Sequence, residues 1–396
     1  MLKLGEFMIN SHYVPRLILR KFSNRLSLYN IKTGELKENI AIEHAYAIEN
    51  YYDDEIEKKL NRQVESQFGD LLSNYILKCE REISLSRKQL YLVKKFLLIS
   101  LLRSIHAEEF MQKEKGLYNT LQSNDIWAPP FEEKQIEGEN SFEYWMRTLK
   151  VVLDTDGTPQ GILEHPDKTY PAYRWATIIC NAYLGFWDAP NVEEFVITDI
   201  GMTSENEKGW NGITIFNHKK KDFILSCLEK TSNPVEKVRL VELGKCMFYE
   251  NFQMFPISSK RMIVLINPFF KYRYMKKQSG GNVPPLEELT VIPNEILFEP
   301  NRIYYKLPQI SQKEPQYHED DRYIYAVKAL SRAEIRYCNA LFLDRIDTYL
   351  GFSTLDHVVG SIIKYKKLND PPYTPRVNYT ALYKIIQERY KGSLNV

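Results

Sequence analysis

The sequence lacks closely spaced cysteines. Its five cysteines lie far apart along 396 residues, and no two of them form a Cys-x-x-Cys pair. Structural zinc sites and disulfide-rich domains both depend on clustered cysteines, so the chain is predicted to contain neither. The same scattered pattern is typical of a reducing compartment. The five positions are Cys79, Cys180, Cys227, Cys246 and Cys338.

The sequence also lacks a long apolar run. Its most apolar stretch, Phe96 to Leu102, is far shorter than the roughly 20 residues that a membrane-spanning helix needs, and Lys and Arg border it. The first six residues include Glu6 and no extended apolar segment, unlike a secretory signal. These absences predict a cytoplasmic protein that does not enter a membrane.

Familiar phosphate, metal and nucleophile motifs are absent as well. No P-loop, dinucleotide-binding Gly-x-Gly-x-x-Gly, His-Glu-x-x-His or EF-hand pattern occurs, and no serine lies in Gly-x-Ser-x-Gly. The nearest approach to a PD-(D/E)xK nuclease motif, Glu242 to Lys245, has one residue too many and a helical context. The net charge of +2 gives no overall field that would gather nucleic acid, so such binding requires a local patch.

Aromatic residues, in contrast, are plentiful, with 27 Tyr and 19 Phe. A tyrosine suits the rim of a core, where the ring packs and the hydroxyl reaches a polar partner. Exposed tyrosines can also provide stacking surfaces for bases. Because the tyrosines are spread along the whole chain, the first use is favoured for most of them. The balance of 44% hydrophobic and 26% charged residues predicts a folded globular protein with a substantial core.

Helical periodicity dominates the pattern of apolar residues. Apolar positions recur near every 3.6 residues from about Asp54 to Cys79, and Ser84-Leu85-Ser86 supplies an N-cap candidate for a helix that continues to about Lys115. Two shorter helical stretches follow residue 351. Further helices are predicted over Tyr173–Trp187, Val235–Phe252 and Arg322–Leu350.

Strand patterns occur in short runs. Lys32-Thr33-Gly34 lies between two strand candidates and indicates a hairpin, because Gly adopts a positive φ readily. Together with the helices, the strands predict an α+β protein that is mostly helical, with a mixed or antiparallel sheet. The other strand candidates are Phe195–Thr198, Ile213–Phe216 and Met262–Ile266.

The N-terminal stretch that begins at His12 is the most informative segment for function. Pro15 suits the first turn of a helix, where its missing N–H has no partner to lose. If that helix reaches Phe22, Arg16 and Arg20 lie four residues apart and share a face. Two guanidiniums and the imidazole can then converge on one anion, since Arg suits carboxylate and phosphate. The alternative is that His12 bonds a backbone carbonyl while the arginines pair with internal acids.

A second candidate lies at the end of the strand that is predicted before Asp199. A carboxylate in that position can bind a metal, a sugar hydroxyl or an arginine, or it can simply cap a turn. Ser258 precedes another predicted strand and can bring a hydroxyl near the carboxylate. Spacing alone leaves these alternatives open.

One basic cluster, over residues 271–277, interleaves cations with aromatic rings, as nucleic-acid contacts often do. Nucleic acid is therefore a candidate partner through Lys271, Arg273, Lys276 and Lys277. A solvated surface is the alternative, because acidic residues balance the charge of the chain overall.

Several of these stretches together resemble a bacterial family described as domain of unknown function DUF4238. The strongest match is the run His12-Tyr13-Val14-Pro15, and the other matches follow in the same order along the chain. They are Leu19-Arg20 with Phe22, Ile42-Glu43, Tyr51-Tyr52-Asp53, Arg103, Thr198-Asp199, Phe255 to Ser258, and Asn339.

The resemblance implies a family domain over residues 1–350 and a C-terminal helical extension over residues 351–396. It implies no particular activity, but it adds Arg103, Ser258 and Asn339 to the candidate substrate-binding residues. Relatives commonly have a proline soon after the acid that corresponds to Asp199, whereas here Ile200, Gly201 and Met202 follow it.

One hypothesis is an enzyme that acts on nucleic acid or another phosphate-bearing substrate, with a nuclease-like role in phage defence. His12 acts as general acid or base in this hypothesis, because its ordinary pKa lies near working pH. Arg16, Arg20 and Arg103 hold phosphate, and Asp199 orients the imidazole or binds a divalent metal. The hypothesis requires these side chains to meet in one concave site.

The alternative hypothesis is a non-catalytic binding or scaffold protein. The same His, Arg and Asp side chains then form a buried network that fixes the N-terminal segment against the core. A partner binds elsewhere, either on a tyrosine-rich surface or on the C-terminal helices.

Overall fold

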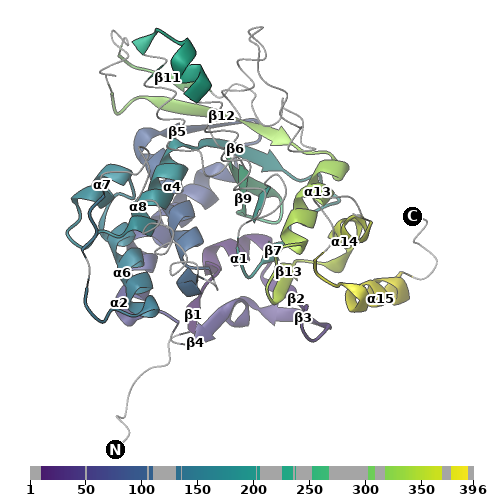
Figure 1. Cartoon of the computed structure of the whole chain (residues 1–396). Helices are drawn as coiled ribbons and strands as arrows, with labels where there is room; N and C mark the ends of the chain where they lie inside the picture. The colour runs from purple at the N-terminus through teal and green to yellow at the C-terminus, as the bar shows by residue number, and fades with distance from the viewer. Residues whose placement is uncertain are drawn as a thin grey trace, which may run out of the picture.

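The computed structural model describes residues 10–49, 51–104, 107–109, 131–134, 136–201, 203–205, 225–234, 237, 252–266, 302–307, 317–367 and 376–390. Over these residues the chain is an α+β protein with more helix than strand (Figure 1). Its strands form one mixed sheet and two antiparallel sheets. The fold class predicted from the sequence is therefore confirmed.

The first elements confirm two local predictions. Pro15 directly precedes helix α1 (Arg16–Phe22), as its fixed φ favours. Strands β2 (Arg25–Asn30) and β3 (Glu35–Ala41) form the predicted hairpin, in which Gly34 has a φ of +74°. Beside them, β1 (Asn10–His12) pairs with β4 (Ala47–Glu49), and η1 (Ile42–His44) is a short 3-10 turn.

A layer of helices follows. The predicted helix over residues 54–79 is present as alternating α and π turns that end at Ile76. Ser86 is the N-cap of α4, where it forms a capping box with Gln89, and α4 ends at Leu102 instead of near Lys115. The elements are α2 (Asp54–Lys59), η2 (Leu60–Glu65), α3 (Ser66–Leu71), η3 (Leu72–Ile76), α4 (Arg87–Leu102), α6 (Ser141–Asp154), α7 (Pro159–Glu164) and α8 (Tyr170–Asn181).

The large sheet runs in the order β11-β12-β6-β10-β9-β8, with β5 also paired to β12. The pairing of β12 with β6 is parallel and the other pairings are antiparallel, so the sheet is mixed. Its strands are β5 (Glu82–Ser86), β6 (Tyr183–Asp188), β8 (Thr203–Glu205), β9 (Phe252–Pro256), β10 (Arg261–Ile266), β11 (Arg302–Tyr304) and β12 (Arg322–Ala329).

A smaller antiparallel sheet, in the order β3-β2-β13-β7, pairs an early part of the chain with a late part. It contains β7 (Ile197–Thr198) and β13 (Tyr349–Phe352), and β13 runs across residue 350. The division of the chain at residue 350 stays a prediction. The remaining C-terminal elements are α13 (Arg332–Leu343), η4 (Leu355–His357), α14 (Val359–Lys366) and α15 (Thr380–Arg389).

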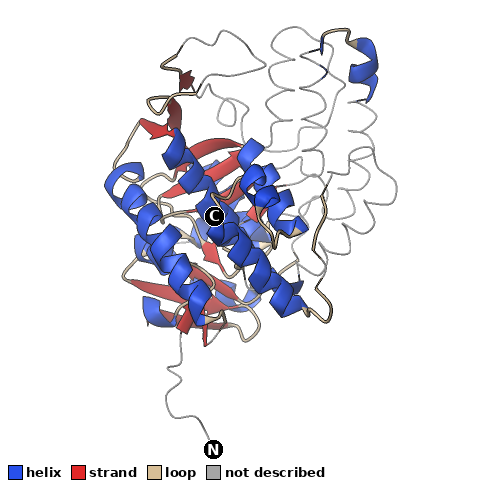
Figure 2. Cartoon of the chain, turned by 90° about the vertical axis from the view of Figure 1, so that its left-hand side faces the viewer, coloured by secondary structure: helices blue, strands red, loops and turns tan. Residues whose placement is uncertain are grey.

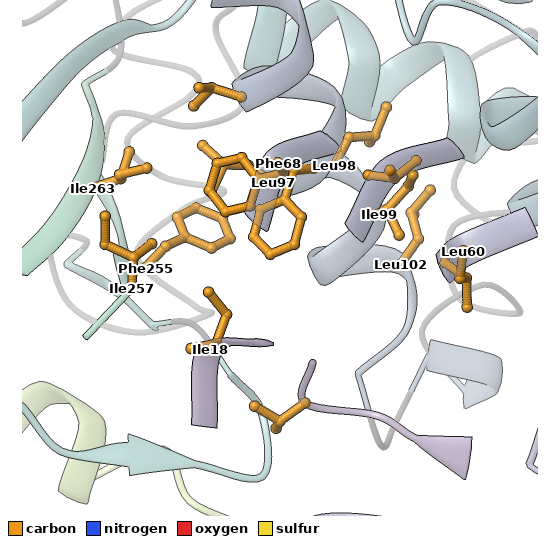
Figure 3. Packing of buried hydrophobic residues seen from close by; sticks show 14 of the residues in the cluster. Ile18, Leu60, Phe68, Leu97, Leu98, Ile99, Leu102, Phe255, Ile257 and Ile263 are labelled. Carbon is orange, nitrogen blue, oxygen red and sulfur yellow. The ribbon is translucent and has the colours of Figure 1, made fainter. Parts of the chain in front are cut away.

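Two hydrophobic cores lie on opposite faces of the large sheet. Side chains alternate between the faces of a strand, so Ile263 of β10 packs with the helical layer while Val264 packs with α13 and α14. From the left-hand side of Figure 1, helices lie in front of the strands (Figure 2). In the first core, Ile18 of α1 and Phe255 of β9 face Leu97 of α4 (Figure 3). Helix α1 is thereby packed against β9 and the helical layer.

Two predicted helices are confirmed only in part, as α13 and α8, because each predicted range also contains strand. The stretch over residues 322–350 is strand β12, then α13, then β13, because Ser331 and Glu334 form a capping box that starts a new helix. The alanines that suggested helical spacing lie in a strand rich in Tyr and branched residues, which suit a sheet. The helix over residues 173–187 ends at Asn181 and gives way to β6.

Other predictions concern residues that the structure does not describe. The strand candidate over residues 213–216 lies outside the described residues, and so does most of the helix predicted over residues 235–252. The candidate strand over residues 262–266 is confirmed as part of β10, and the strand before Asp199 is confirmed as β7.

Candidate functional site

Arg16 and Arg20 lie on one face of α1, as their spacing predicts. Both guanidiniums approach the same carboxylate oxygen, Glu43 Oε1, with Nη2 at 2.8 Å for Arg16 and 3.9 Å for Arg20. All three side chains are exposed to solvent in large part. The pair of arginines thus converges on an acid of the chain itself, at the surface of the molecule.

His12 lies under this surface, at the end of β1, with 4% of its area exposed. Its ring Nε2 is 3.2 Å from the backbone oxygen of Ile42, in the turn that also supplies Glu43. The backbone carbonyl of His12 accepts a hydrogen bond from Arg103. Both ends of this histidine therefore contact neighbouring segments that hold β1 in place.

Arg103 follows the last residue of α4 and is almost completely buried, with 1% exposed. Its guanidinium donates to Glu65 and to the carbonyl of His12, while Nε is buried without a hydrogen-bond partner in the described part of the chain. Burial opposes the charged form, but Glu65 outweighs it and the pKa of Arg103 is raised. The hydroxyl of Tyr52 donates to the Arg103 carbonyl at 2.9 Å. Arg103 thus ties together the helical layer and the N-terminal strand.

Asp199 directly follows β7 and is fully buried. Its carboxylate accepts backbone N–H bonds from Asp347 at 3.0 Å, from Tyr349 at 2.9 Å and from Thr348. Burial raises the pKa of Asp199, while the three N–H donors favour the ionised form and act in the opposite direction. The side chain therefore clamps the end of β7 to the start of β13, and its backbone N–H donates back to the Tyr349 carbonyl at 3.3 Å.

Two tyrosines complete this region, and one of them, Tyr46, was not among the residues predicted from the sequence. The hydroxyl of Tyr46 donates to the Ile197 carbonyl at 3.0 Å and lies 3.3 Å from the Tyr349 carbonyl. The ring of Tyr13, within the opening motif, meets Tyr46 edge-on at 6.0 Å. A Cβ on Gly351 would lie 2.4 Å from the Tyr46 hydroxyl, so glycine is needed there. A glycine inside a strand indicates that another group approaches the backbone closely. Gly351 was therefore the signal in the sequence for this contact.

Ser258 and Asn339 lie in other parts of the fold. The Ser258 hydroxyl accepts backbone N–H bonds from Lys260 at 3.2 Å and Arg261 at 2.8 Å, which closes the turn between β9 and β10. Asn339 is buried within α13, where its amide oxygen accepts from the Val196 N–H at 3.1 Å. Its amide nitrogen donates to the carbonyl of Glu194 at 2.8 Å. Both residues hold backbone segments together.

Two lysines of α4 also bind main-chain carbonyls. The Lys94 ammonium of α4 donates to the carbonyls of Cys180 and, at 2.9 Å, Ala182 at the end of α8. These carbonyls have no partner within their own helix, and the cation also favours the negative end of the helix dipole. Burial lowers the pKa of Lys94 to about 8. The half-buried Lys95 binds the carbonyls of Leu153 and Thr155 at the end of α6 in the same way.

The candidate residues therefore form separate groups. Arg16 and Arg20 meet at Glu43, His12 meets Arg103, and Asp199 meets the backbone of residues 347–349. The basic cluster over residues 271–277, with Lys271, Arg273, Lys276 and Lys277, lies outside the described residues.

Two further features of the described ranges bear on the candidate site. Within them, no group of three or more His, Cys, Asp or Glu side chains is placed to hold a metal ion. In the same ranges, no helix has the length and apolar character needed to cross a membrane.

Comparison with known proteins assigns the family. The model of a family described as "Protein of unknown function (DUF4238)" matches residues 10–350, which is most of the chain. The chain therefore belongs to this family, as the opening motif suggested. The match includes the segments of His12, Arg103, Asp199 and Asn339, and it ends within β13, before α14 and α15. No curated protein and no solved structure matches the chain.

Proposed function

We propose that the protein is a non-catalytic binding or scaffold protein, in which the His12, Arg103 and Asp199 network is structural. The observation that carries this proposal is the environment of Asp199. Both oxygens of its carboxylate accept backbone N–H bonds from residues 347–349, and the group has no exposed area. A general base or metal ligand needs a lone pair that faces the substrate or the ion, and these oxygens face the main chain.

The surroundings of His12 support the same proposal. A general acid or base must reach the substrate within about 3 Å, or through one water. The ring of His12 is buried and its Nε2 faces the Ile42 carbonyl. Buried charges elsewhere in the molecule, such as Lys94, also bind backbone groups. His12, Arg103, Asp199 and Lys94 thus all bind main-chain groups in the described part of the chain.

One observation favours the second candidate, an enzyme directed at phosphate. Arg16 and Arg20 present two guanidiniums at the surface, where phosphate could replace Glu43 as their anion. The basic cluster over residues 271–277 stays a candidate for nucleic-acid binding on its sequence. A nuclease-like role in phage defence also stays a hypothesis on these grounds.

A turnover assay distinguishes the two proposals. Purified protein is incubated with labelled RNA, DNA and nucleotides, with and without Mg²⁺ or Mn²⁺, beside the variants His12→Gln and His44→Gln. His44 is the matched control because it lies two residues beyond the Ile42 carbonyl and is exposed. We expect no product from any of the three proteins, with a lower melting temperature for His12→Gln alone. Product that is lost in His12→Gln at an unchanged melting temperature would overturn the proposal.

A further inference from the structure

A small pocket lies between the two C-terminal helices, α14 and α15. The two helices contact each other at the C-terminal end of the chain (Figure 1). The volume of the pocket is about 120 Å³. An apolar cavity of about 150 Å³ accepts benzene, so this pocket has room for one small ring. Its lining includes three tyrosines, one lysine and two further polar residues, namely Tyr365, Tyr379, Tyr383, Lys366, Asn378 and Thr380.

Two of the tyrosines form a fixed wall of the pocket. Tyr365 and Tyr379 are buried, and their rings meet edge to face with centres 5.4 Å apart. The Tyr365 hydroxyl donates to Asp344 at 2.8 Å and accepts the backbone N–H of Val377 at 3.0 Å. The Tyr379 hydroxyl donates to the Leu343 carbonyl at 2.8 Å. Because both hydroxyls are bonded within the protein, these residues offer their apolar rings to a ligand.

The third tyrosine carries a cation. The Lys366 ammonium lies 3.5 Å from the ring centre of Tyr383, and both residues line the pocket. Lys366 is exposed, and no carboxylate among the described residues pairs with it. In contrast, Arg389 of α15 forms two hydrogen bonds with Glu38, each of 2.9 Å. The Lys366 ammonium is therefore available to an anion that the described part of the chain does not supply.

Asn378 supplies a second donor to the pocket. Its side-chain oxygen accepts the backbone N–H of Thr380 at 2.8 Å, which leaves the amide nitrogen to a ligand. That nitrogen and the Lys366 ammonium can donate hydrogen bonds but cannot accept them. A ligand that uses both groups must therefore provide acceptors. A carboxylate provides two acceptor oxygens together with the negative charge that suits Lys366.

A phenyl ring suits the pocket better than a nucleobase does. The ring nitrogens and exocyclic groups of a base need hydrogen-bond partners when they leave water, and the hydroxyls of Tyr365 and Tyr379 are already bonded. A phenyl ring has no polar group to satisfy and gains from contact with the tyrosine rings. A cationic ligand is disfavoured by Lys366 and by three further lysines that have no carboxylate partner among the described residues. They are Lys364, Lys367 and Lys384.

We propose that the pocket binds a small aromatic carboxylate, with the ring between the tyrosines and the carboxylate at Lys366 and Asn378. The inference rests on the proposed binding function and names the chemistry of a ligand. The lining residues lie beyond residue 350, in the predicted C-terminal extension. A free acid and the C-terminal aromatic residue of a partner protein both present a ring and a carboxylate, so they share this chemistry.

Fluorine NMR of 3-(4-fluorophenyl)propionate with the full chain provides the test. We expect saturable line broadening with a dissociation constant on the order of 1 mM or tighter, as for other ligands of about a dozen non-hydrogen atoms. The corresponding propionamide has the same ring without the charge. It should bind about two- to fivefold more weakly than the acid, as expected for the loss of one exposed ion pair.

Two variants separate the cation from the ring. Lys366 is exposed, so Lys366→Met should keep the fold, and in this variant the acid should lose its advantage over the amide. The control Lys364→Met should keep that advantage, because Lys364 is exposed on the same helix and does not line the pocket. Tyr383→Ser removes the ring and should weaken both probes at least about fivefold, whereas Tyr383→Phe should bind both as the unmodified chain does.

Two hexapeptides that end in phenylalanine distinguish the sources of the ligand. One has a free C-terminal carboxylate and the other is amidated. Tighter binding of the free-acid peptide than of fluorophenylpropionate identifies the C-terminus of a partner protein as the ligand. Weaker binding of that peptide identifies a small free acid.

Four results would overturn this inference. They are no saturable binding of the acid up to about 10 mM, an acid preference that Lys366→Met leaves unchanged, hexanoate that binds as tightly as the aromatic acid, and tighter binding of an oligothymidylate of about 20 nucleotides that needs Tyr383. Failure of the proposed function is recognised separately, because it appears as His12-dependent turnover. Turnover together with Lys366-dependent binding removes only the proposed function, and the absence of both removes only this pocket.

Discussion

The region around His12, Arg103 and Asp199 and the region around strand β11 use their side chains in opposite ways. Around β1, α1 and β13, ionised and polar groups such as His12, Arg103 and Asp199 are buried and bind the main chain. Around β11, aromatic groups such as Tyr304 and Tyr317 are exposed and held in place by a buried acid. The residue types that suggest chemistry thus bind main-chain groups inside the protein, whereas these two tyrosines face solvent.

This contrast has a physical basis in the cost of burial. A buried charge is tolerated only when hydrogen bonds replace its hydration, and main-chain groups at strand and helix ends supply them in this fold. Exposure of a tyrosine ring to water is unfavourable, because the ring is apolar. A cluster of exposed rings is therefore typical of a surface that binds a partner. Location relative to solvent therefore decides the role of each group more than its identity does.

The largest effect is expected for Arg103→Met. The substitution keeps much of the side-chain volume but leaves Glu65 and the His12 carbonyl without their donor. Breaking a buried ion pair commonly costs about 3 to 5 kcal/mol. Urea unfolding should show a loss of that size, and a variant of the exposed Arg20 to Met is the matched control. A loss below about 1 kcal/mol would mean that the buried network does not support the fold.

The next effect concerns pH and Lys94. Its pKa is lowered to about 8 in the folded protein, against 10.5 for an unperturbed lysine. Between these values the unfolded chain binds more protons, so the free energy of unfolding should rise with pH from about 8 to about 10. The full shift corresponds to about 3 kcal/mol. The rise should be absent in Lys94→Met, measured by urea unfolding at several pH values, and an equal rise in both proteins would contradict the assignment.

The smallest effect is expected for the exposed tyrosines around β11. Tyr304→Ser and Tyr317→Ser remove exposed rings, so each should change the free energy of unfolding by no more than about 0.5 kcal/mol. Thermal and urea unfolding of both variants provide the measurement. A loss of about 2 kcal/mol or more is typical of truncating a buried side chain. Such a loss would show that these rings belong to the core.

Local features could be predicted from the sequence because their causes lie within a few residues. The hairpin at Gly34, the cap at Ser86 and the shared face of Arg16 and Arg20 each depend on spacings of two to four positions. Family membership was also predictable, since the opening motif is a continuous run.

The contacts of the candidate site residues and the pairing of β12 could not be predicted, because the partners lie far away in the chain. Asp199 is clamped by residues about 150 positions later, and Arg103 binds a carbonyl 91 positions earlier, and neither distance leaves a pattern in the sequence. Strand β12 was mistaken for helix because its pairing with β5 and β6 outweighed local spacing. The exposed tyrosines could not be told from buried ones by composition.

Whether Asp199 stabilises the fold is measured by equilibrium unfolding of Asp199→Asn. The amide keeps one acceptor but turns an N–H₂ group towards backbone donors that need an oxygen. We predict a loss of about 2 kcal/mol, as expected for buried hydrogen bonds to a charged group, and no loss for the control Asp70→Asn, since Asp70 is exposed. An unchanged or increased stability of Asp199→Asn would contradict it, because active-site acids are typically held at a cost to the fold.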